Sequence, residues 1–422
     1  MRRILFLTLL LIALLSLIAV SPVSAGQSTG TDKQVVGYFT EWGIYGANYL
    51  VKNIVTSGSA DRLTVINYAF ANVAPDGNGN ITCQLFDPWA DYQKPWDPAQ
   101  SVNGQEVTWP NPILGNFQQL KALKAQYPKL KVLISLGGWT GSSHFSDAAL
   151  PENRVAFVHS CIDLLIKGNL PDPGWGGMGG PGSGAGVFDG IDIDWEYPGA
   201  CGDTCNYRPE DPQNFTALLA EFRRQLNAVN PNLLLTIAAS ASEANSAKIQ
   251  VSQVTRSLNW INLMTYDFHG AWETTTNFNS PLYTSSNDPS GKARSSVSHA
   301  VGIYMARGAP ANKLVVGAPF YGYGWSGVPN IKHGLYQPAA GALGSATYNV
   351  IKAKGYPQYW DNLTKDAWVF DSATQEFWTY DDPQVMAQRS AFIDTKGLRG
   401  VMFWELSGDT TDGELIHALV GH

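Results

Sequence analysis

Residues 188–199 read Phe-Asp-Gly-Ile-Asp-Ile-Asp-Trp-Glu-Tyr-Pro-Gly, with acidic and apolar side chains alternating up to a Pro-Gly pair. Successive side chains of a β-strand point to opposite faces, so Asp192, Asp194 and Glu196 share one face. The isoleucines and the tryptophan between them form the other face. The pattern predicts a buried strand over Phe188–Glu196.

Seven further runs, rich in β-branched and aliphatic residues, have the length of buried parallel strands. Amphipathic stretches lie between several of them. Pro212–Val229, for example, follows Asp211 and stops before an Asn-Pro pair, as helices commonly do. Eight strands separated by helices predict an α/β fold, a (β/α)8 TIM barrel, with a doubly wound sheet as the alternative. The seven runs are Gln34–Phe39, Leu63–Phe70, Lys131–Leu136, Leu233–Ala239, Trp260–Tyr266, Lys313–Pro319 and Gly400–Trp404.

Loops that lead from a strand into a helix lie at the carboxyl face of such a barrel, where barrel enzymes carry their chemistry. Asp76–Gly115 is a long loop of this kind with Trp89, Trp96 and Trp109, so we expect it to wall a cleft. The glycine-rich stretch Pro171–Gly186 leads into a strand instead. We expect it to be a flexible connector at the opposite face.

The interval Gly324–Asp382, between the last two strand runs, is too long for a simple connection. It contains the strand-like runs Ala367–Phe370 and Glu376–Tyr380. We therefore predict a small α+β insertion on the active face of a catalytic barrel domain that spans residues 26–422.

The amino terminus has the pattern of a secretory signal peptide, residues 1–25. Arg2 and Arg3 precede an apolar run from Ile4 to Val20, and small residues of a cleavage site follow at 23–25. A retained membrane anchor is the alternative, but the run is marginal in length for a span. We therefore expect a secreted, extracellular protein without a membrane association after cleavage.

The composition narrows the classes of protein. A chain with 44% apolar and 15% charged residues can bury a large core, which excludes disorder. Without the two signal-peptide arginines, 26 basic residues face 35 acidic ones, a net charge of −9 that argues against nucleic acid as a partner. The 14 Trp, 18 Tyr and 17 Phe favour aromatic platforms for an uncharged ligand such as a sugar.

Four cysteines, Cys83, Cys161, Cys201 and Cys205, allow three disulfide pairings, and export permits disulfides. Cys201 and Cys205 could close a small loop. Their spacing lacks the partners of a zinc site, so we expect no metal there.

The acidic face of Phe188–Glu196 is the chemically informative feature. Alternate residues of a strand lie about 6.8 Å apart, so the three acids form a ladder along the barrel interior with Glu196 at the mouth. Such a buried row is costly unless the acids share protons, which raises at least one pKa and suits a general acid. A calcium or magnesium site is an alternative, but its ligands come from polar, glycine-turned loops. The other alternative is a ladder of acids with a purely structural role.

Asp189-x-x-Asp192-x-Asp194-x-Glu196 resembles the signature of family 18 glycoside hydrolases, the chitinases and their relatives. Four more motifs stand in the family's order, so the resemblance covers nearly the whole mature chain. Many of these chitinases carry an insertion where Gly324–Asp382 lies. The four motifs are Lys131–Trp139 with Ser135, Gly137 and Gly138 in matching places, Met264–Asp267, Ala318–Gly322 and Phe403–Glu405.

The resemblance implies a substrate-assisted mechanism. Glu196 would protonate the glycosidic oxygen, and the N-acetyl carbonyl of the substrate would attack the anomeric carbon to form an oxazolinium ion. Asp194 would orient the acetamide, stabilise its positive charge and pass a proton with Asp192, while Tyr266 would donate to the acetamide oxygen. The spacing agrees, because all three acids share one face and leave no obvious carboxylate nucleophile across the sugar ring.

The resemblance also implies which residues hold the sugar. Trp404 would be the floor under the distorted sugar, with a core tryptophan as the alternative. Independently of the resemblance, Trp139 and Trp272 follow strand ends directly, so we expect them to be outer platforms, with ordinary packing as an equal alternative. The other expected substrate-binding residues are Tyr38 and Ser135, which would hydrogen-bond Asp192, and Met264, Asp267 and Tyr321.

One position departs from the family pattern. Where related chitinases usually read Tyr-Gly-Arg, this chain reads Tyr321-Gly-Tyr323, so a phenol replaces a guanidinium that would help to hold the sugar. The change bears on affinity or length preference at that side of the cleft and leaves the acid machinery untouched. His144, His269 and His333 have no Gly-x-Ser-x-Gly elbow beside them, so we expect ordinary hydrogen-bonding roles.

These features together predict a secreted chitinase that hydrolyses β-1,4 bonds between N-acetylglucosamine units of chitin and chito-oligosaccharides with retention of configuration. We expect a monomer without a cofactor or a metal. One alternative is an endo-β-N-acetylglucosaminidase that acts on glycoprotein glycans with the same site. The other is a chitinase-like lectin, a class that usually lacks the acid that Glu196 supplies here.

Overall fold

The computed structural model describes residues 33–291 and 294–420. The expected signal peptide lies outside the described residues, so both the peptide and export stay predictions. In the described part of the chain, no helix is long and apolar enough to cross a bilayer.

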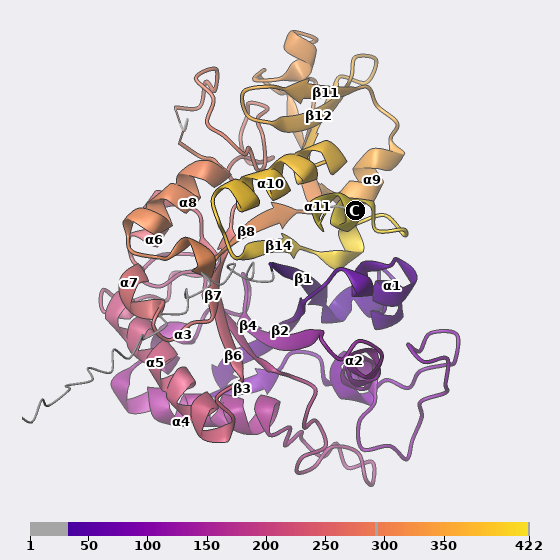
Figure 1. Cartoon of the computed structure of the whole chain (residues 1–422), viewed down its shortest axis with the longest axis vertical. Coiled ribbons are helices and arrows are strands. Elements are labelled where there is room, and N and C mark those ends of the chain that lie inside the picture. Colours follow the sequence, from indigo (N-terminus) through magenta and orange to yellow (C-terminus); the bar gives the residue numbers. More distant parts are fainter. Residues whose placement is uncertain (1–32, 292–293, 421–422) are drawn as a thin grey trace, which may run out of the picture. The chain divides into compact units, whose positions relative to one another are not determined.

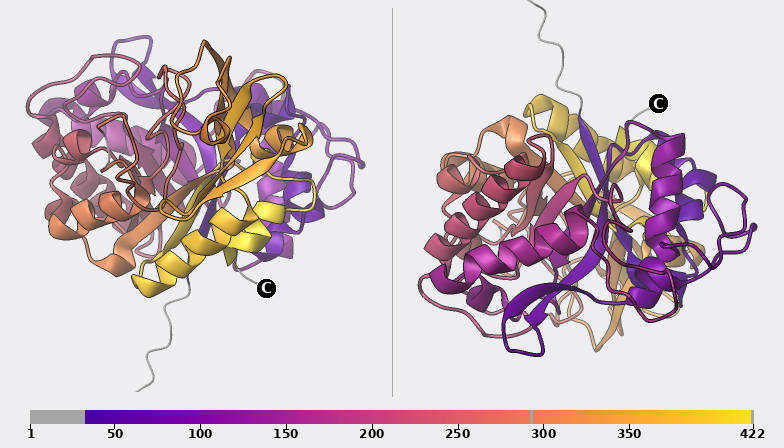
Figure 2. Two further views of the ribbon diagram at one scale, coloured as in Figure 1. Left: turned by 90° about the horizontal axis from the view of Figure 1, so that it is seen from above. Right: turned by 90° about the horizontal axis from the view of Figure 1, so that it is seen from below.

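Eight parallel strands close into a barrel, as predicted, and the helices surround it (Figures 1 and 2). The strand order is β1-β14-β8-β7-β6-β5-β4-β2, and β2 pairs with β1 to complete the ring. The doubly wound alternative is wrong, because the pairing of β1 with β2 closes the ring, whereas the two end strands of an open sheet do not pair with each other. The barrel strands are β1 (Gln34–Thr40), β2 (Val65–Pro75), β4 (Lys131–Gly137), β5 (Gly190–Asp194), β6 (Leu234–Ser240), β7 (Trp260–Met264), β8 (Leu314–Pro319) and β14 (Gly400–Trp404).

The helices pack an apolar stripe against the outside of the barrel. In α5, Phe215, Leu218, Leu219, Phe222 and Leu226 follow helical spacing and are buried, whereas Ala220 and Arg224 are exposed. The helices are α1 (Val51–Thr56), α2 (Gly115–Gln126), α3 (Phe145–Ala148), α4 (Pro151–Cys161), α5 (Asp211–Val229), α6 (Glu243–Ser246), α7 (Val251–Val254), α8 (Val297–Ala306), α9 (Tyr348–Ala353), α10 (Pro383–Thr395) and α11 (Glu414–Val420).

The loop after β2 is more ordered than its sequence indicates. It opens with β3 (Ile81–Leu85), which pairs antiparallel with the end of β2, and continues to Phe86 at the edge of a cleft. Trp96 is a core residue whose indole donates to the Gly115 carbonyl, whereas Trp89 and Trp109 are exposed. Only part of the loop therefore walls the cleft.

The glycine-rich segment lies along the barrel wall rather than only at the opposite face. Its carbonyls accept hydrogen bonds from Lys121 and Lys124 of α2, and Gly179 donates to Pro112 in the loop before that helix. A Cβ on Gly179 would lie 2.0 Å from the Pro171 carbonyl oxygen, so the close turn requires glycine there. These contacts fasten the segment to α2 and to the loop before it, although most of its residues are exposed.

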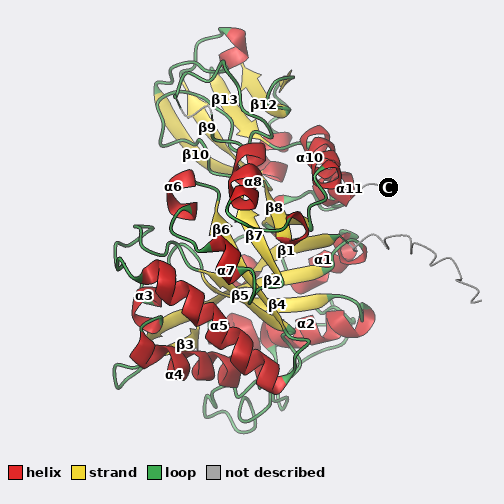
Figure 3. Ribbon diagram, turned by 60° about the vertical axis from the view of Figure 1, so that its left-hand side comes forward, coloured by secondary structure: helices red, strands yellow, loops and turns green. Residues whose placement is uncertain are grey.

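The predicted insertion is a five-stranded antiparallel sheet, seen at the top of Figure 3. Its order is β10-β9-β13-β12-β11, and it has its own aromatic core around Trp325, Trp368 and Phe377. The first strand follows β8 directly, so the sheet begins at Tyr321, three residues before the range expected from sequence. The strands are β9 (Tyr321–Ser326), β10 (Gly341–Thr347), β11 (Gln358–Asp361), β12 (Asp366–Asp371) and β13 (Glu376–Tyr380).

Two disulfides join Cys83 to Cys161 and Cys201 to Cys205, over separations of 78 and 4 residues. Replacing the first pair by serine should lower the free energy of unfolding by about 4 kcal/mol, and replacing the second by about 2 kcal/mol, because a longer closed loop restricts the unfolded chain more. Urea unfolding of the two double variants tests this order. An equal loss, or a larger loss from the short loop, would contradict it.

Candidate active site

Strand β5 turns its acids inward and its apolar side chains outward. Asp192 and Asp194 are buried inside the barrel, while Ile191 and Ile193 join the outer core. Regular pairing stops at Asp194, before the predicted end of the strand, and the backbone amide of Glu196 donates to the Ser142 hydroxyl instead of to a neighbouring strand. Glu196 therefore follows the strand, at the barrel mouth.

Asp192 is the innermost acid, and four side chains donate to its carboxylate. Tyr38 and Ser135 donate to one oxygen at 2.8 and 2.9 Å, the contacts that the family resemblance implies. Thr236 and Asn262 donate to the other oxygen. Burial raises the pKa of Asp192, and these donors oppose the rise.

Sequence reasoning missed Thr236 and Asn262 as partners of Asp192. Thr236 lies directly opposite Asp192 in the pairing of β6 with β5. Asn262 is the one polar residue of the strand segment Trp-Ile-Asn-Leu-Met. A polar residue inside an otherwise apolar barrel strand is the signal that could have identified both.

The other two acids share an environment that favours protonation. Burial, then the charges of Glu196 and Asp192, raise the pKa of Asp194 well above its usual range. Its Oδ1 atom is buried without a hydrogen-bond partner among the described residues. Burial, and secondarily the charge of Asp267, raise the pKa of Glu196 to about 7, against an opposing hydrogen bond from Tyr197. Glu196 can therefore hold a proton near neutral pH.

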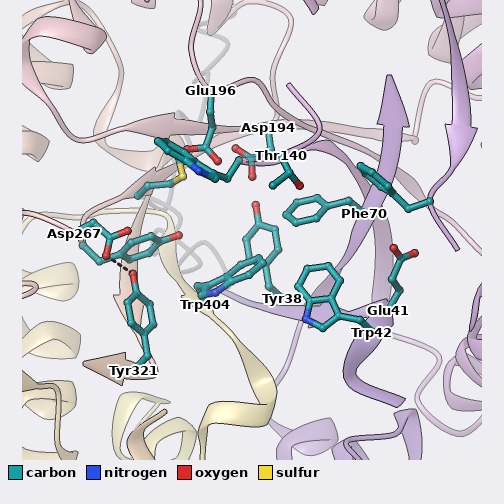
Figure 4. Close-up of a pocket in the computed structure, with 14 residues that line it drawn as sticks. Tyr38, Glu41, Trp42, Phe70, Thr140, Asp194, Glu196, Asp267, Tyr321 and Trp404 are labelled. Carbon is teal, nitrogen blue, oxygen red and sulfur yellow. Dashed lines mark hydrogen bonds between the residues drawn. The ribbon is translucent and has the colours of Figure 1, made fainter. Parts of the chain in front are cut away.

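The carboxyl groups of Asp194 and Glu196 point into a cleft of about 480 Å³ (Figure 4). Trp404 lines this cleft and also packs against the inner core of the barrel; its ring centroid lies 5.3 Å from that of Tyr38 and 5.8 Å from that of Phe70, on which it stacks. The further lining residues are Glu41, Trp42, Phe86, Trp139, Thr140, Met264, Tyr266, Asp267 and Tyr321.

Three aromatic residues of this wall, Trp42, Phe70 and Phe86, were not predicted from the sequence. Trp42 follows β1 by two residues, and Phe70 lies where β2 reaches the barrel mouth. The rule that identified Trp404 and Trp139, an aromatic residue at the carboxyl end of a barrel strand, would also have selected these two.

A second hollow, of about 440 Å³, adjoins the first at Glu196 and also contains Met264, Tyr266 and Asp267. The rest of its lining is mostly polar and comes from β6, α6 and the start of α8. Glu196 thus stands between an aromatic hollow and a polar one. The polar lining includes Ser240, Ser242, Glu243, Asn245, Arg294, Ser295 and His299.

Asp267 lies at the junction of the two hollows and is held by two tyrosines. Tyr321 and Tyr323 donate to the same carboxylate oxygen at 2.6 and 2.8 Å. The phenol of Tyr266 lies in both hollows and approaches the sulfur of Met402.

The two expected outer platforms differ in position. Trp139 is 51% exposed and lines the main cleft. Trp272 is 58% exposed but lines a neighbouring hollow with Tyr336, and its ring edge packs against Tyr323 at 5.0 Å.

The three histidines make local contacts away from Asp192, Asp194 and Glu196. His269 is buried and bonds to Glu273 at 2.8 Å, and His333 stacks on Tyr359 at 4.0 Å. His144 lies 3.5 Å from Asp147. In the described residues, no group of three or more histidine, cysteine or acidic side chains could hold a metal ion.

A closed barrel whose acidic strand leads to a sugar-sized aromatic cleft defines a glycoside hydrolase fold and site. The sequence matches Glycosyl hydrolases family 18 over residues 34–409. The chain belongs to this family, which confirms the resemblance inferred from its motifs.

Individual proteins similar to this chain agree with the family assignment. Chitinase C of Streptomyces lividans is 39% identical over 92% of this chain and 60% of that protein. The catalytic domain of a psychrophilic chitinase B from Arthrobacter TAD20 is 37% identical, with a TM-score of 0.86 over 93% of this chain and 95% of that one. A family 18 N-acetylglucosaminidase from Paenibacillus barengoltzii is 29% identical, with a TM-score of 0.69 over 92% and 99% of the two chains. This chain spans about 60% of the length of the chitinases from Streptomyces and Niallia circulans that it matches.

Proposed function

We propose that this protein is a secreted chitinase that hydrolyses β-1,4 bonds between N-acetylglucosamine units with retention of configuration. One observation carries the proposal: Glu196, with a pKa raised to about 7, stands between two joined hollows at the end of a ladder of buried acids. A glycosidic bond laid across that junction would place its oxygen at the proton of the acid.

In the proposed mechanism Glu196 protonates the leaving oxygen while the acetamide oxygen of the substrate attacks the anomeric carbon. Asp194, whose Oδ1 has no partner among the described residues, accepts the acetamide N–H and stabilises the positive oxazolinium ion. Because burial raises the pKa of Asp192, its carboxylate can take up the proton that Asp194 gives up as the oxazolinium ion forms. Glu196, now ionised, then removes a proton from the water that opens the ring.

The shape and lining of the cleft support a chain of N-acetylated sugars as substrate. Sugar rings stack their apolar faces on aromatic side chains, and Trp404, Phe70 and Trp42 present such surfaces on one side of Glu196. Tyr266 borders both hollows and would donate to the acetamide oxygen. Hydrogen-bonding groups dominate the other side, which would receive the leaving part of the chain. The proposed partners are therefore chitin and chito-oligosaccharides, bound by a monomer without cofactor, nucleic acid or membrane.

The anomer released first tests the mechanism. Attack by the acetamide, followed by water from the opposite side, inverts the anomeric carbon twice, so the new reducing end should be β. Proton NMR of chitohexaose during the first minutes of digestion, before mutarotation, measures this directly. An initial α anomer would contradict participation by the acetamide.

The similarity to the Paenibacillus N-acetylglucosaminidase makes a related glycosidase the second candidate. Products from chitohexaose and from a high-mannose glycoprotein separate the possibilities. A chitinase releases chitobiose and longer oligomers from the first substrate and leaves the second intact. Release of single N-acetylglucosamine units, or of the glycoprotein glycan, would favour the glycosidases, and binding without any product would favour a lectin.

A further inference from the structure

The strand that follows the barrel presents two tyrosines to Asp267. Tyr321 and Tyr323 alternate with Gly322 and Gly324 along β9, so both phenols lie on one face of the strand. A Cβ on Gly322 would lie 1.8 Å from the Thr379 carbonyl oxygen, and one on Gly324 would lie 2.5 Å from the Trp378 ring. The glycine face is therefore closed by β13, and both phenols point toward Asp267.

The two phenols converge on a single atom, the Oδ1 of Asp267. Asp267 has a φ of 56°, in the left-handed region that non-glycine residues seldom adopt. Its backbone amide donates to the Asn279 side chain at 2.8 Å. Contacts from outside its own segment thus hold this carboxylate, and Trp272, packed against Tyr323, limits the movement of the phenol.

Both donors are electrically neutral, and in the described part of the chain no lysine or arginine pairs with Asp267. Its side chain is accessible to solvent although protein atoms surround it. The other titratable or charged groups around Glu196 and Asp267 are Tyr38 of β1, Glu41 after β1, Asp192 and Asp194 of β5, Tyr197, Glu243 of α6, Tyr266, Arg294 and His299 before and in α8, and Glu405 after β14.

We propose that Tyr323 is a positioning residue that, together with Tyr321, fixes the Asp267 carboxylate through neutral donors and leaves its negative charge directed at Glu196. A phenol orients a carboxylate without cancelling its charge, whereas a guanidinium at the same place would do both. This chain has a phenol at the position where the family pattern led us to expect arginine, so the change acts on the acid Glu196, which the sequence alone led us to regard as untouched.

The consequence concerns the pH range in which the acid works, and it rests on the proposed role of Glu196. An adjacent negative charge disfavours ionisation of Glu196 and so raises its pKa. Activity that needs the protonated acid is lost as the pH rises through that pKa. A positive charge beside Asp267 would stabilise the ionised acid and move the loss of activity to lower pH.

The test compares Tyr323→Arg and Tyr323→Phe with wild type in the pH profile of kcat/KM on chitotetraose. We expect Tyr323→Arg to shift the alkaline limb of the pH profile to lower pH by roughly 0.5–1 pH unit, which is typical of a new positive charge near a titrating carboxyl group. Tyr323→Phe leaves the charge of Asp267 in place, so its limb should stay within about 0.3 pH unit of wild type while kcat/KM falls severalfold, because one anchor of the carboxylate is lost. Ser372→Arg, on the exposed β12–β13 turn, adds the same charge far from the cleft and should reproduce the wild-type profile.

A second readout does not depend on turnover. The side-chain carboxyl carbon of Glu196, labelled with ¹³C and assigned through Glu196→Gln, reports its own titration by NMR, and its midpoint should fall in Tyr323→Arg by the same amount. If the Glu196 titration midpoint and the alkaline limb of the pH profile in Tyr323→Arg both coincided with those of wild type, the electrostatic role of Tyr323 would be wrong. Unchanged kcat/KM in Tyr323→Phe would overturn the positioning role. If wild type cleaves no chitin oligomer, the proposed function fails, and the NMR midpoint still decides the role of Tyr323.

Discussion

Glu196→Gln is expected to lower kcat on chitohexaose by about 10³-fold, within the range that general acid catalysis contributes, with KM changed only severalfold. Glutamine keeps the size and the hydrogen bonds of the side chain but has no proton to deliver, so the leaving oxygen would have to depart as an alkoxide. Initial rates and substrate affinity, measured separately, test the expectation. The wild-type enzyme should lose activity as the pH rises through about 7, because the pKa of Glu196 lies there.

The matched control is Glu221→Gln, the same chemical change on the outer helix α5, where the carboxylate pairs with exposed Arg224. Glu221 lies outside the cleft, so the rate should stay near wild type, while the loss of its pairing with a side chain only 12% exposed should lower stability by about 1 kcal/mol. Comparable turnover by Glu196→Gln and wild type would remove the acid assignment. A large rise in KM with unchanged kcat would make Glu196 only a sugar contact.

Asp194→Asn should be the second most damaging change, lowering kcat by about 10²–10³-fold while KM changes little. The positive charge on the acetamide develops only as the oxazolinium ion forms, so a carboxylate that stabilises it acts on the transition state more than on bound substrate. Asparagine can still accept a hydrogen bond from the acetamide, but it carries no charge and passes no proton. Steady-state kcat and KM on chitotetraose distinguish the two effects.

Asp189→Asn is the control for this variant, because it alters the first acid of the same motif at the other end of the strand. Asp189 pairs with Lys124 at 2.7 Å and accepts the backbone amide of Val132, both remote from the cleft. The control should lower thermal stability and keep kcat within a fewfold of wild type. If Asp194→Asn weakened substrate binding but left kcat unchanged, Asp194 would be only a sugar contact. The proposed mechanism would then have no carboxylate that stabilises the oxazolinium ion.

Much of the fold followed from local patterns. The eight strand runs predicted the closed barrel, and the interval between the last two predicted the extra sheet, because apolar periodicity depends only on neighbours along the chain. The hydrogen bonds that fasten the glycine-rich segment could not be predicted from such local patterns. Its position depends on hydrogen bonds from Lys121, Lys124 and Gly179 to groups distant in sequence.

At the site, too, local patterns predicted some features, and contacts between residues distant in sequence decided the others. Strand alternation alone placed Asp192 and Asp194 on one face, since the period of two is a property of the backbone. Composition could not tell that Trp96 is buried while Trp89 and Trp109 are exposed, because packing partners decide burial. The bonds from Tyr321 and Tyr323 to Asp267 join residues 54 and 56 positions apart. The pairing of β7 with β8 brings Asp267 beside Tyr321, and the pairing of β9 with β13 holds Tyr323 on the same side, so tertiary structure decided how the charge beside Glu196 is held.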